Sequence, residues 1–202
     1  MSGEPKIRLI LASKSAARQA LLRGAGVAFE AMGAALDEDD VKDDLAAHGL
    51  DPKAMALALA QAKAVETSKA VEGLVIGGDQ TLDLDGELVG KATDLGAARE
   101  RLKALRGRKH QLHSATAAAQ GGELLWTDVR TASLTMRRFS DAFLDGYLTR
   151  NAEAALASVG CYQLEGEGVQ LFDRIDGDYF TILGLPLPPL LEFLRGRGVV
   201  ET

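Results

Sequence analysis

The stretch VIGGDQTLDLDGELVGK, from Val75 to Lys91, reads as a β-hairpin whose two ends carry more chemistry than a hairpin needs. Asp85 and Gly86 form a dipeptide that is typical of a tight two-residue turn. At one end, two glycines precede an aspartate and a glutamine, and at the other a glycine precedes a lysine. The stretch therefore predicts a pair of strands that places polar groups together at the rim of a sheet.

The register of this hairpin follows from its turn. Leu84 is expected to pair with Glu87, and counting outward pairs Gln80 with Lys91. Because side chains alternate between the two faces of a strand, Asp79 should point away from the face of Gln80. If Asp79, Gln80 and Lys91 serve one substrate, we expect an irregular strand around the two glycines, or strand ends that splay.

The rest of the chain alternates strands and helices early and is rich in strands later. A short apolar run predicts a buried strand, serines and Asp51-Pro52 are typical helix starts, and Asp-Gly pairs are typical turns. The expected elements are a strand at 7–12, helices at 13–26, 51–72, 93–107 (capped by Thr93), 140–150 and 188–195, β-structure at 109–138, and a second hairpin turning at 176–177. This order predicts one α/β domain, residues 1–202, with a mixed sheet.

Composition narrows the class of protein. The 202 residues are 47% hydrophobic, which is enough for one sizeable core, and the net charge of −6 disfavours wrapping of duplex DNA. The single cysteine, Cys161, allows no internal disulfide and no zinc motif, as expected in a reducing cytoplasm. No segment approaches the length of a membrane span. The sequence predicts a cytoplasmic protein with no nucleic-acid polymer and no membrane as partner.

Two further stretches could hold a phosphate and a metal ion. Ser13, Ser15 and Arg18 surround an expected helix start, where unpaired N–H groups and a positive partial charge favour a phosphate. Ordinary helix capping by serine is the alternative. The acidic run LDEDD, residues 36–40, offers oxygen ligands for Mg²⁺ or Mn²⁺, although a solvated loop or helix start is the more common role of such a run.

A glycine-rich stretch near the C-terminus could recognise a base. GCYQLEGEG, residues 160–168, contains Glu165, whose carboxylate can accept hydrogen bonds from two nitrogens of guanine. A plain surface turn would explain the glycines equally well.

Taken together, these stretches resemble the Maf family. The resemblance rests on five motifs in the same order: LILASKSAARQALLRGAGVAFE, LDED, the lysine of AQAKA, VIGGDQTLDLDGELVGKATD, and the pair GCYQLEGEG and FDRIDGDYFTILGLPL. It covers nearly the whole chain, from Leu9 to about Leu194. It implies an elongated mixed β-sheet with flanking helices, in a Maf and inosine-triphosphatase-like fold whose two lobes surround a cleft.

The resemblance also implies an activity. Maf-like enzymes hydrolyse the bond between the α and β phosphates of a nucleoside triphosphate, with a divalent metal ion, Mg²⁺ or Mn²⁺, as cofactor. They give a nucleoside monophosphate and pyrophosphate. A cytoplasmic location and a homodimer are implied as well.

The implied roles transfer residue by residue. Asp79 matches the catalytic acid-base aspartate and Glu38 an active-site carboxylate, and both would help to hold the metal. The phosphate-handling set matches Ser13, Ser15, Arg18, Lys63 and Lys91.

Base selection is implied at three positions. Gln80 and Glu165 match the members that act on 7-methyl-GTP, whereas members that act on dTTP and UTP have threonine after the aspartate. Ala16 and Ala17 depart from the family, which has proline and then a large arginine or tryptophan there. Ala17 thus lacks a side chain that could stack on or bond a base.

Three readings follow. The first is a nucleoside triphosphate pyrophosphatase that prefers 7-methyl-GTP. The second is a dTTP or UTP pyrophosphatase of the same family, which Gln80 and Glu165 disfavour. The third is a non-catalytic nucleotide sensor that regulates cell division, which Asp79, Lys63 and Lys91 disfavour.

Overall fold

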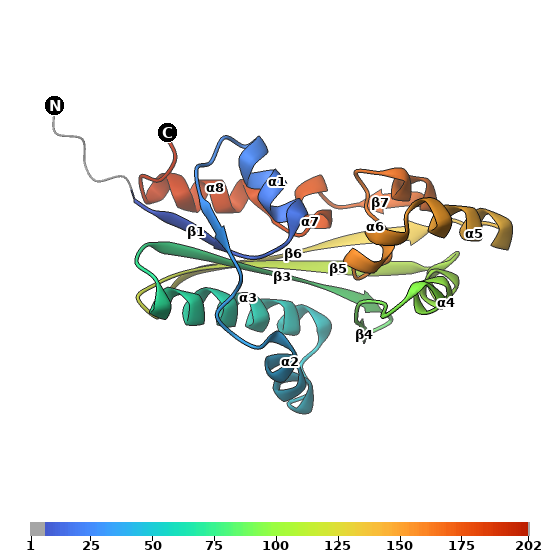
Figure 1. The fold of residues 1–202 in the computed structure, drawn as a ribbon, viewed down its shortest axis with the longest axis horizontal. Coiled ribbons are helices and arrows are strands. Elements are labelled where there is room, and N and C mark those ends of the chain that lie inside the picture. The colour runs from blue at the N-terminus through green and yellow to red at the C-terminus, as the bar shows by residue number, and fades with distance from the viewer. Residues whose placement is uncertain (1–6, 202) are drawn as a thin grey trace.

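A computed structural model describes residues 7–201, without the side chains of Asp39, Asp43 and Ala46. The described residues form a seven-stranded mixed sheet in the order β2-β1-β3-β5-β6-β7, with β4 paired to β3 (Figure 1). The strands are β1 Leu9–Ala12, β2 Glu30–Met32, β3 Leu74–Leu84, β4 Glu87–Val89, β5 Lys109–Gln120, β6 Glu123–Met136 and β7 Phe172–Asp176. The helices are α1 Ala16–Gly24, α2 Glu38–Ala47, α3 Pro52–Ala70, α4 Leu95–Leu105, α5 Asp141–Arg150, α6 Ala152–Ala157, α7 Tyr179–Ile182 and α8 Leu187–Gly196, with a 3₁₀ turn at Glu167–Leu171.

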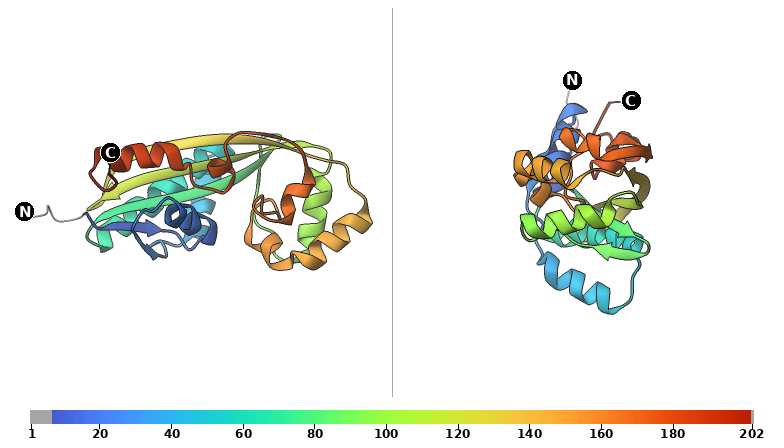
Figure 2. Two further views of the ribbon diagram at one scale, coloured as in Figure 1. Left: turned by 90° about the horizontal axis from the view of Figure 1, so that it is seen from above. Right: turned by 90° about the vertical axis from the view of Figure 1, so that its right-hand side faces the viewer.

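Three long strands give the molecule its elongated shape. β3, β5 and β6 contain 11, 12 and 14 residues and run through both halves of the molecule (Figures 1 and 2). We call the half that contains β1, β2 and α1 to α3 the first lobe, and the half that contains β4, α4 to α6 and β7 the second lobe. Figure 2 shows that α1 and the group α4 to α6 stand on the same side of the curved sheet, with a space between them. The predicted two-lobed mixed α/β fold is confirmed.

Each lobe has its own apolar core. In the first lobe, β1 and β3 pack against α1 and α8 through leucines and isoleucine such as Leu11, Ile76 and Leu190. In the second lobe, the far ends of β3, β5 and β6 pack against α4 and α5 through residues such as Leu102 and Tyr147. Removing this apolar surface from water stabilises each lobe, while the three long strands join the two cores.

The edge of β3 has a gap between the two lobes. β1 pairs in parallel with residues 74–77, and β4 pairs antiparallel with residues 82–84. β5 occupies the opposite edge along residues 75–83 without a break, so β1 and β4 must share the remaining edge. Residues 78–81 therefore have no strand neighbour on that edge, and side chains from both faces of β3 can reach the space beside them.

The glycines before Asp79 allow close approach and do not distort the strand. A Cβ at Gly77 would lie 2.3 Å from the carbonyl oxygen of Ala60, and one at Gly78 would lie 3.3 Å from Cδ of Arg18. α3 thus rests directly on the backbone of β3, with a surface of alanines that includes Ala60 and Ala64. The expected irregularity at the glycines is wrong, because the ladder with β5 keeps its register there.

The hairpin was only partly predicted. Leu84 pairs with Glu87 as expected, but β4 ends at Val89. The expected pairing of Gln80 with Lys91 is wrong, because the β3–β4 ladder stops at the pair of Leu82 with Val89. The second expectation, that the ends of the two strands splay apart, is met, because the chain leaves the sheet after Val89.

Other local expectations have mixed outcomes. Asp51 caps α3 and Ser140 caps α5, as predicted. Asp94, and not Thr93, caps α4, and the acidic run begins α2 at Glu38. The predicted second hairpin, with its turn at 176–177, is wrong. Asp178 caps α7, so the chain continues as a helix and not as a strand.

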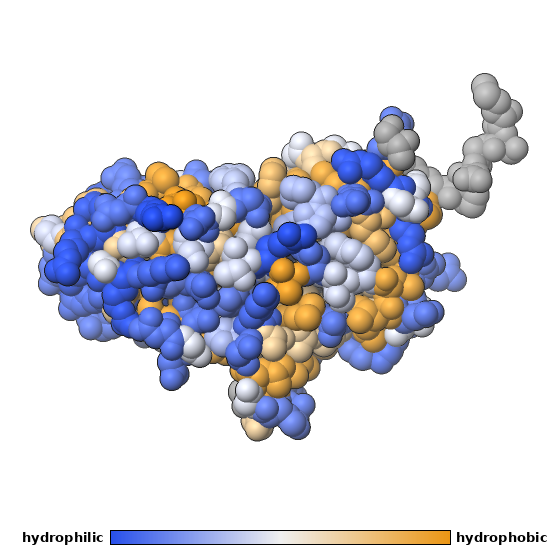
Figure 3. Space-filling model, turned by 180° about the vertical axis from the view of Figure 1, so that it is seen from behind, coloured by the Kyte–Doolittle hydropathy of each residue, from blue (hydrophilic) through white to orange (hydrophobic). Residues whose placement is uncertain are grey.

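The face opposite that of Figure 1 is mixed in polarity. Apolar residues on it gather mainly toward the half nearer the N-terminus, between hydrophilic residues (Figure 3). Among the described residues, no helix is both long and apolar enough to cross a membrane.

Candidate active site

The gap in the edge of β3 opens into a cavity of about 730 Å³ between the lobes. This volume lies within the range of small-molecule sites. The cavity is lined by every residue that the sequence singled out for catalysis, phosphate binding or base selection: Ser13, Ser15, Ala17, Arg18, Glu38, Lys63, Asp79, Gln80, Lys91 and Glu165. Residues separated by more than 150 positions in the chain therefore meet in one place.

At its centre, one lysine lies between two carboxylates. Nζ of Lys63 lies 2.7 Å from Oδ1 of Asp79 and 2.8 Å from Oε2 of Glu38. Lys63 and Asp79 are buried, while the side chain of Glu38 remains 44% exposed. A buried ammonium and a buried carboxylate each need an opposite charge, and here they supply it to one another.

The backbone explains how these three groups meet. Lys63 comes from the face of α3 that packs on the sheet, at a position enclosed by the close approach at Gly77. Asp79 follows that glycine by two residues and lies in the gap of β3. Glu38 is the first residue of α2, so it reaches the pair from a helix start.

The charge on Glu38 is favoured by its neighbours. Partial burial would raise the pKa of this carboxyl, but the hydrogen bond and charge of Lys63, with the charges of Lys42 and Arg18, lower the pKa below its ordinary value. Glu38 is therefore ionised at neutral pH beside Lys63.

Arg18, on α1, lines the cavity. Its Nε donates to the carbonyl of Gly184 over 2.7 Å, and its Nη1 donates to Oγ of Ser13 over 3.2 Å. Desolvation lowers the pKa of Arg18, while the charges of Asp79 and Glu38 oppose this shift. An arginine stays protonated in such a setting, so it supplies a fixed positive charge.

The start of α1 adds N–H groups beside this charge. Ser15 is its N-cap, and Oγ of Ser15 accepts the backbone N–H of Arg18 over 3.4 Å. The capping role considered from the sequence is therefore real. It leaves other N–H groups of the first turn at the cavity, next to Ala16 and Ala17, where an anion would be favoured.

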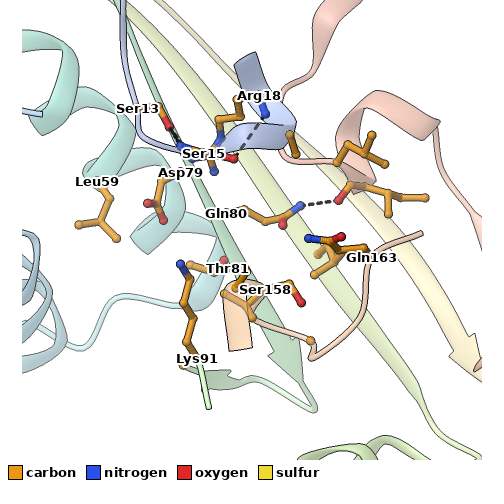
Figure 4. A pocket seen from close by; sticks show the side chains of 18 of the residues that line it. Ser13, Ser15, Arg18, Leu59, Asp79, Gln80, Thr81, Lys91, Ser158 and Gln163 are labelled. Carbon is orange, nitrogen blue, oxygen red and sulfur yellow. Dashed lines mark hydrogen bonds between the residues drawn. The ribbon is translucent and has the colours of Figure 1, made fainter. Parts of the chain in front are cut away.

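Gln80 leaves the opposite face of β3 from Asp79. Its Nε2 lies 2.8 Å from Oγ of Ser114, 2.9 Å from the carbonyl of Ile182 and 3.1 Å from that of Thr181. Figure 4 shows Gln80 extending toward this turn and Asp79 extending toward Leu59 of α3. The gap in the sheet edge lets both side chains line one cavity although they lie on opposite faces.

Lys91 stands at the second-lobe side of the cavity. It lies just past the end of β4 and is exposed, and in Figure 4 its ammonium group points into the cavity. The splaying of the strand after Val89 places it there, and a regular ladder would not.

The far wall of the cavity, which we call the loop wall, consists of residues 157–160 and 162–165 together with Leu88 and Val89. Tyr162 anchors it from behind, because its hydroxyl lies 2.8 Å from Nε2 of buried His110. Burial lowers the pKa of His110 to about 4, so this histidine is neutral near pH 7. In the part of the chain that the structure describes, the side chains of Gln163 and Glu165 have no hydrogen-bond or ion-pair partner and line the cavity.

The carboxylates at this site could hold a divalent metal ion only together with oxygen atoms of a bound ligand. In the described chain, no three histidine, cysteine, aspartate or glutamate side chains gather closely enough to hold an ion. Glu38 and Asp79 do converge, and Mg²⁺ in phosphate-processing sites is commonly held by one or two carboxylates and by substrate phosphates. Two further carboxylates of the acidic run were candidates for holding the ion. Asp37 is exposed, and the side chain of Asp39 is not among those that the structure describes.

Sequence comparison agrees with this geometry. The chain matches the family described as "Maf-like protein" over residues 8–197. The chain belongs to the Maf family. A Nucleoside triphosphate pyrophosphatase of Caulobacter vibrioides is 57% identical over 95% of this chain and 96% of its own. A 7-methyl-GTP pyrophosphatase of Rhizobium meliloti is 50% identical over 96% of this chain and 98% of its own.

Solved structures give a weaker match. A Nucleoside-triphosphatase / dITP/XTP pyrophosphatase from Mycobacterium abscessus is 15% identical, covers 95% of this chain and 94% of its own, and has a TM-score of 0.44. The family assignment of this Maf chain accordingly rests on its sequence.

Sequence reasoning missed part of the site. Ser114 is an isolated strand serine, whereas Leu88 and Gln163 lie in the hairpin and in the glycine-rich stretch, both of which the sequence singled out for other residues. Ser114 could have been found from the register of β3 with β5, which places it beside Gln80. Leu88 and Gln163 required the packing of the second lobe.

Proposed function

We propose that this Maf protein is a nucleoside triphosphate pyrophosphatase that hydrolyses the α–β phosphate bond, with 7-methyl-GTP as its preferred class of substrate. The observation that carries the proposal is the buried Lys63, held by Asp79 and Glu38 inside a cavity between two lobes. The two relatives described above carry names for this reaction, and one of them names 7-methyl-GTP.

Positive charges and N–H groups in the cavity would bind the phosphates. The positive charges of Arg18, Lys63 and Lys91 would balance the triphosphate and the charge that develops on the departing pyrophosphate. N–H groups at the start of α1 would add hydrogen bonds to phosphate oxygens. These interactions act most strongly where charge grows in the transition state, and they therefore favour the reaction over simple binding.

Asp79 would be the general base. Its Oδ1 is bonded to Lys63, which leaves Oδ2 to accept a proton from the attacking water. Lys63 fixes the orientation of this carboxylate through that hydrogen bond. The water attacks the α phosphorus, the bond to the bridging oxygen breaks, and pyrophosphate leaves with that oxygen.

Glu38 and Asp79 would hold a divalent metal, Mg²⁺ or Mn²⁺, together with phosphate oxygens. When bound, the ion would neutralise phosphate charge and acidify a water molecule. We further propose that residues 1–202 form one catalytic domain and that the protein is a cytoplasmic homodimer, as expected from the sequence.

The test is pyrophosphate release from a panel of nucleoside triphosphates that contains 7-methyl-GTP, GTP, dTTP and UTP, each with Mg²⁺ and with Mn²⁺. We expect pyrophosphate and monophosphate as products and the highest kcat/KM with 7-methyl-GTP. Release of inorganic phosphate alone, or no turnover of any member, would reject the reaction. A preference for dTTP or UTP would reject the base assignment and keep the reaction.

A further inference from the structure

The orientation of the Gln80 amide is fixed by acceptor groups. Its amide faces the backbone carbonyls of Ile182 and Thr181 at 2.9 and 3.1 Å. A carbonyl oxygen can only accept a hydrogen bond, so the side of the amide that faces the two carbonyls must be the nitrogen. The chemistry of the surroundings, and not only atom placement, therefore assigns Nε2 to that side.

Ser114 completes this arrangement. It is fully buried and lies opposite Gln80 in the β3–β5 ladder. Its hydroxyl donates to the carbonyl of Thr181 over 2.6 Å, which leaves Oγ as an acceptor for Nε2 of Gln80 at 2.8 Å. The serine thus holds both the glutamine and the turn that the glutamine contacts.

The consequence concerns the other end of the amide. With both N–H groups of Gln80 directed at Ser114, Thr181 and Ile182, its Oε1 is the group that remains for a ligand. In Figure 4 this oxygen lies on the side of Gln80 that is turned toward the cavity and Gln163. The cavity also contains Glu165, whose carboxylate can only accept hydrogen bonds when ionised.

We infer that Ser114, with the carbonyls of Thr181 and Ile182, positions Gln80 to present an acceptor oxygen, and that this selects a base whose ring edge carries adjacent N–H donors, as guanine does. Guanine offers its ring N1–H and its exocyclic amino group side by side, whereas uracil offers one ring N–H between two carbonyls. The inference rests on the proposed function, because it assigns the base-selecting part of the same cavity.

The chain contains a matched control for Ser114. Thr116 lies two residues further along β5, on the same face, and is also fully buried. Its hydroxyl has no hydrogen-bond partner among the described residues. Thr116→Val therefore removes a buried hydroxyl from the same strand without touching Gln80.

The experiment measures the ratio of the dissociation constants of UMP and GMP by calorimetry. The two ligands share a ribose phosphate, so the ratio isolates the base. We expect wild type and Thr116→Val to prefer GMP, and Ser114→Ala to lose about fivefold of that preference, as for loss of one hydrogen bond. Thermal melting checks that Ser114→Ala is folded.

A second variant separates positioning from simple acceptor character. Gln80→Glu retains acceptor oxygens but cannot donate to the carbonyls of Thr181 and Ile182, so it should also lose the GMP preference. Equal affinity of wild type for GMP and UMP, or an unchanged ratio in Ser114→Ala or in Gln80→Glu, would overturn the inference. Pyrophosphate release by wild type is assayed in parallel, so a GMP preference without turnover rejects only the proposed function.

Discussion

The two walls of the cavity are built in different ways. The charged wall of the first lobe contains Lys63, Asp79 and Arg18, each bonded to a fixed neighbour before any ligand arrives. The loop wall of the second lobe is anchored from behind by Tyr162, but Gln163 and Glu165 lack partners among the described residues. Burial therefore pre-organises the charged wall, where we propose that phosphates bind. The loop wall, where we propose that the base binds, instead presents polar groups that a ligand would have to satisfy.

The most severe way to break the charged wall is Asp79→Asn. Loss of the general base is expected to lower kcat by about 10²- to 10⁴-fold, because asparagine cannot accept the proton from water. The measurement is pyrophosphate release at saturating nucleotide. Asp83→Asn is the control, since Asp83 lies on the same strand and face and pairs with His113 at 3.3 Å outside the cavity. Near-normal turnover by Asp79→Asn would contradict the mechanism.

Lys63→Met tests whether the charged wall depends on its buried cation. The change leaves Asp79 buried without its partner, and the free energy of unfolding should fall by about 3 kcal/mol in denaturant titrations. Lys69→Met is the control, because Lys69 pairs with Glu66 on the same helix and both side chains of this pair are exposed.

The direction in which the stability difference between wild type and Lys63→Met changes with pH follows from the pKa of Glu38. The lowered pKa of Glu38 contributes stability above its ordinary pKa, and this contribution is lost as the pH falls through the lowered value. The advantage of wild type over Lys63→Met should therefore shrink below about pH 4. A difference that grows in acid would show that Lys63 does not act through these carboxylates.

Gly77→Ala disturbs the contact that places Lys63 beside Asp79. The new Cβ would lie 2.3 Å from the carbonyl of Ala60, so α3 must shift. We expect a loss of about 1–3 kcal/mol in stability, together with lower kcat. Gly196→Ala is the control, because no atom of the described residues outside its helix lies within 4 Å of the added methyl. Full stability of Gly77→Ala would refute the close packing of α3 on β3.

The smallest expected effect concerns the loop wall. Glu165→Gln should reduce the preference for 7-methyl-GTP over UTP by about tenfold, since one hydrogen bond to a charged group is lost, and should leave melting unchanged. Glu153→Gln, an exposed change on α6 outside the cavity, serves as the comparison. An unchanged substrate ratio would mean that Glu165 does not read the base.

Local patterns predicted much of the scaffold. Helix caps at Asp51 and Ser140 and the turn at Asp85-Gly86 depend on neighbours within a few residues, so the sequence is sufficient for them. The second Asp-Gly pair misled because Asp178 bonds the backbone N–H of Thr181 and starts a helix. An aspartate serves turns and caps equally well, and the choice depends on what the following residues pack against.

The sequence alone was sufficient to predict the alternation of strands and helices, and it contains the glycines that permit close packing and the polar residues that line the cavity. How those residues meet depends on the tertiary structure. β1 and β4 share one edge of β3 but leave residues 78–81 uncovered, so Asp79 and Gln80 reach a single cavity from opposite faces. Strand alternation is a local property, whereas a gap between two strand partners arises from packing between segments far apart in the chain.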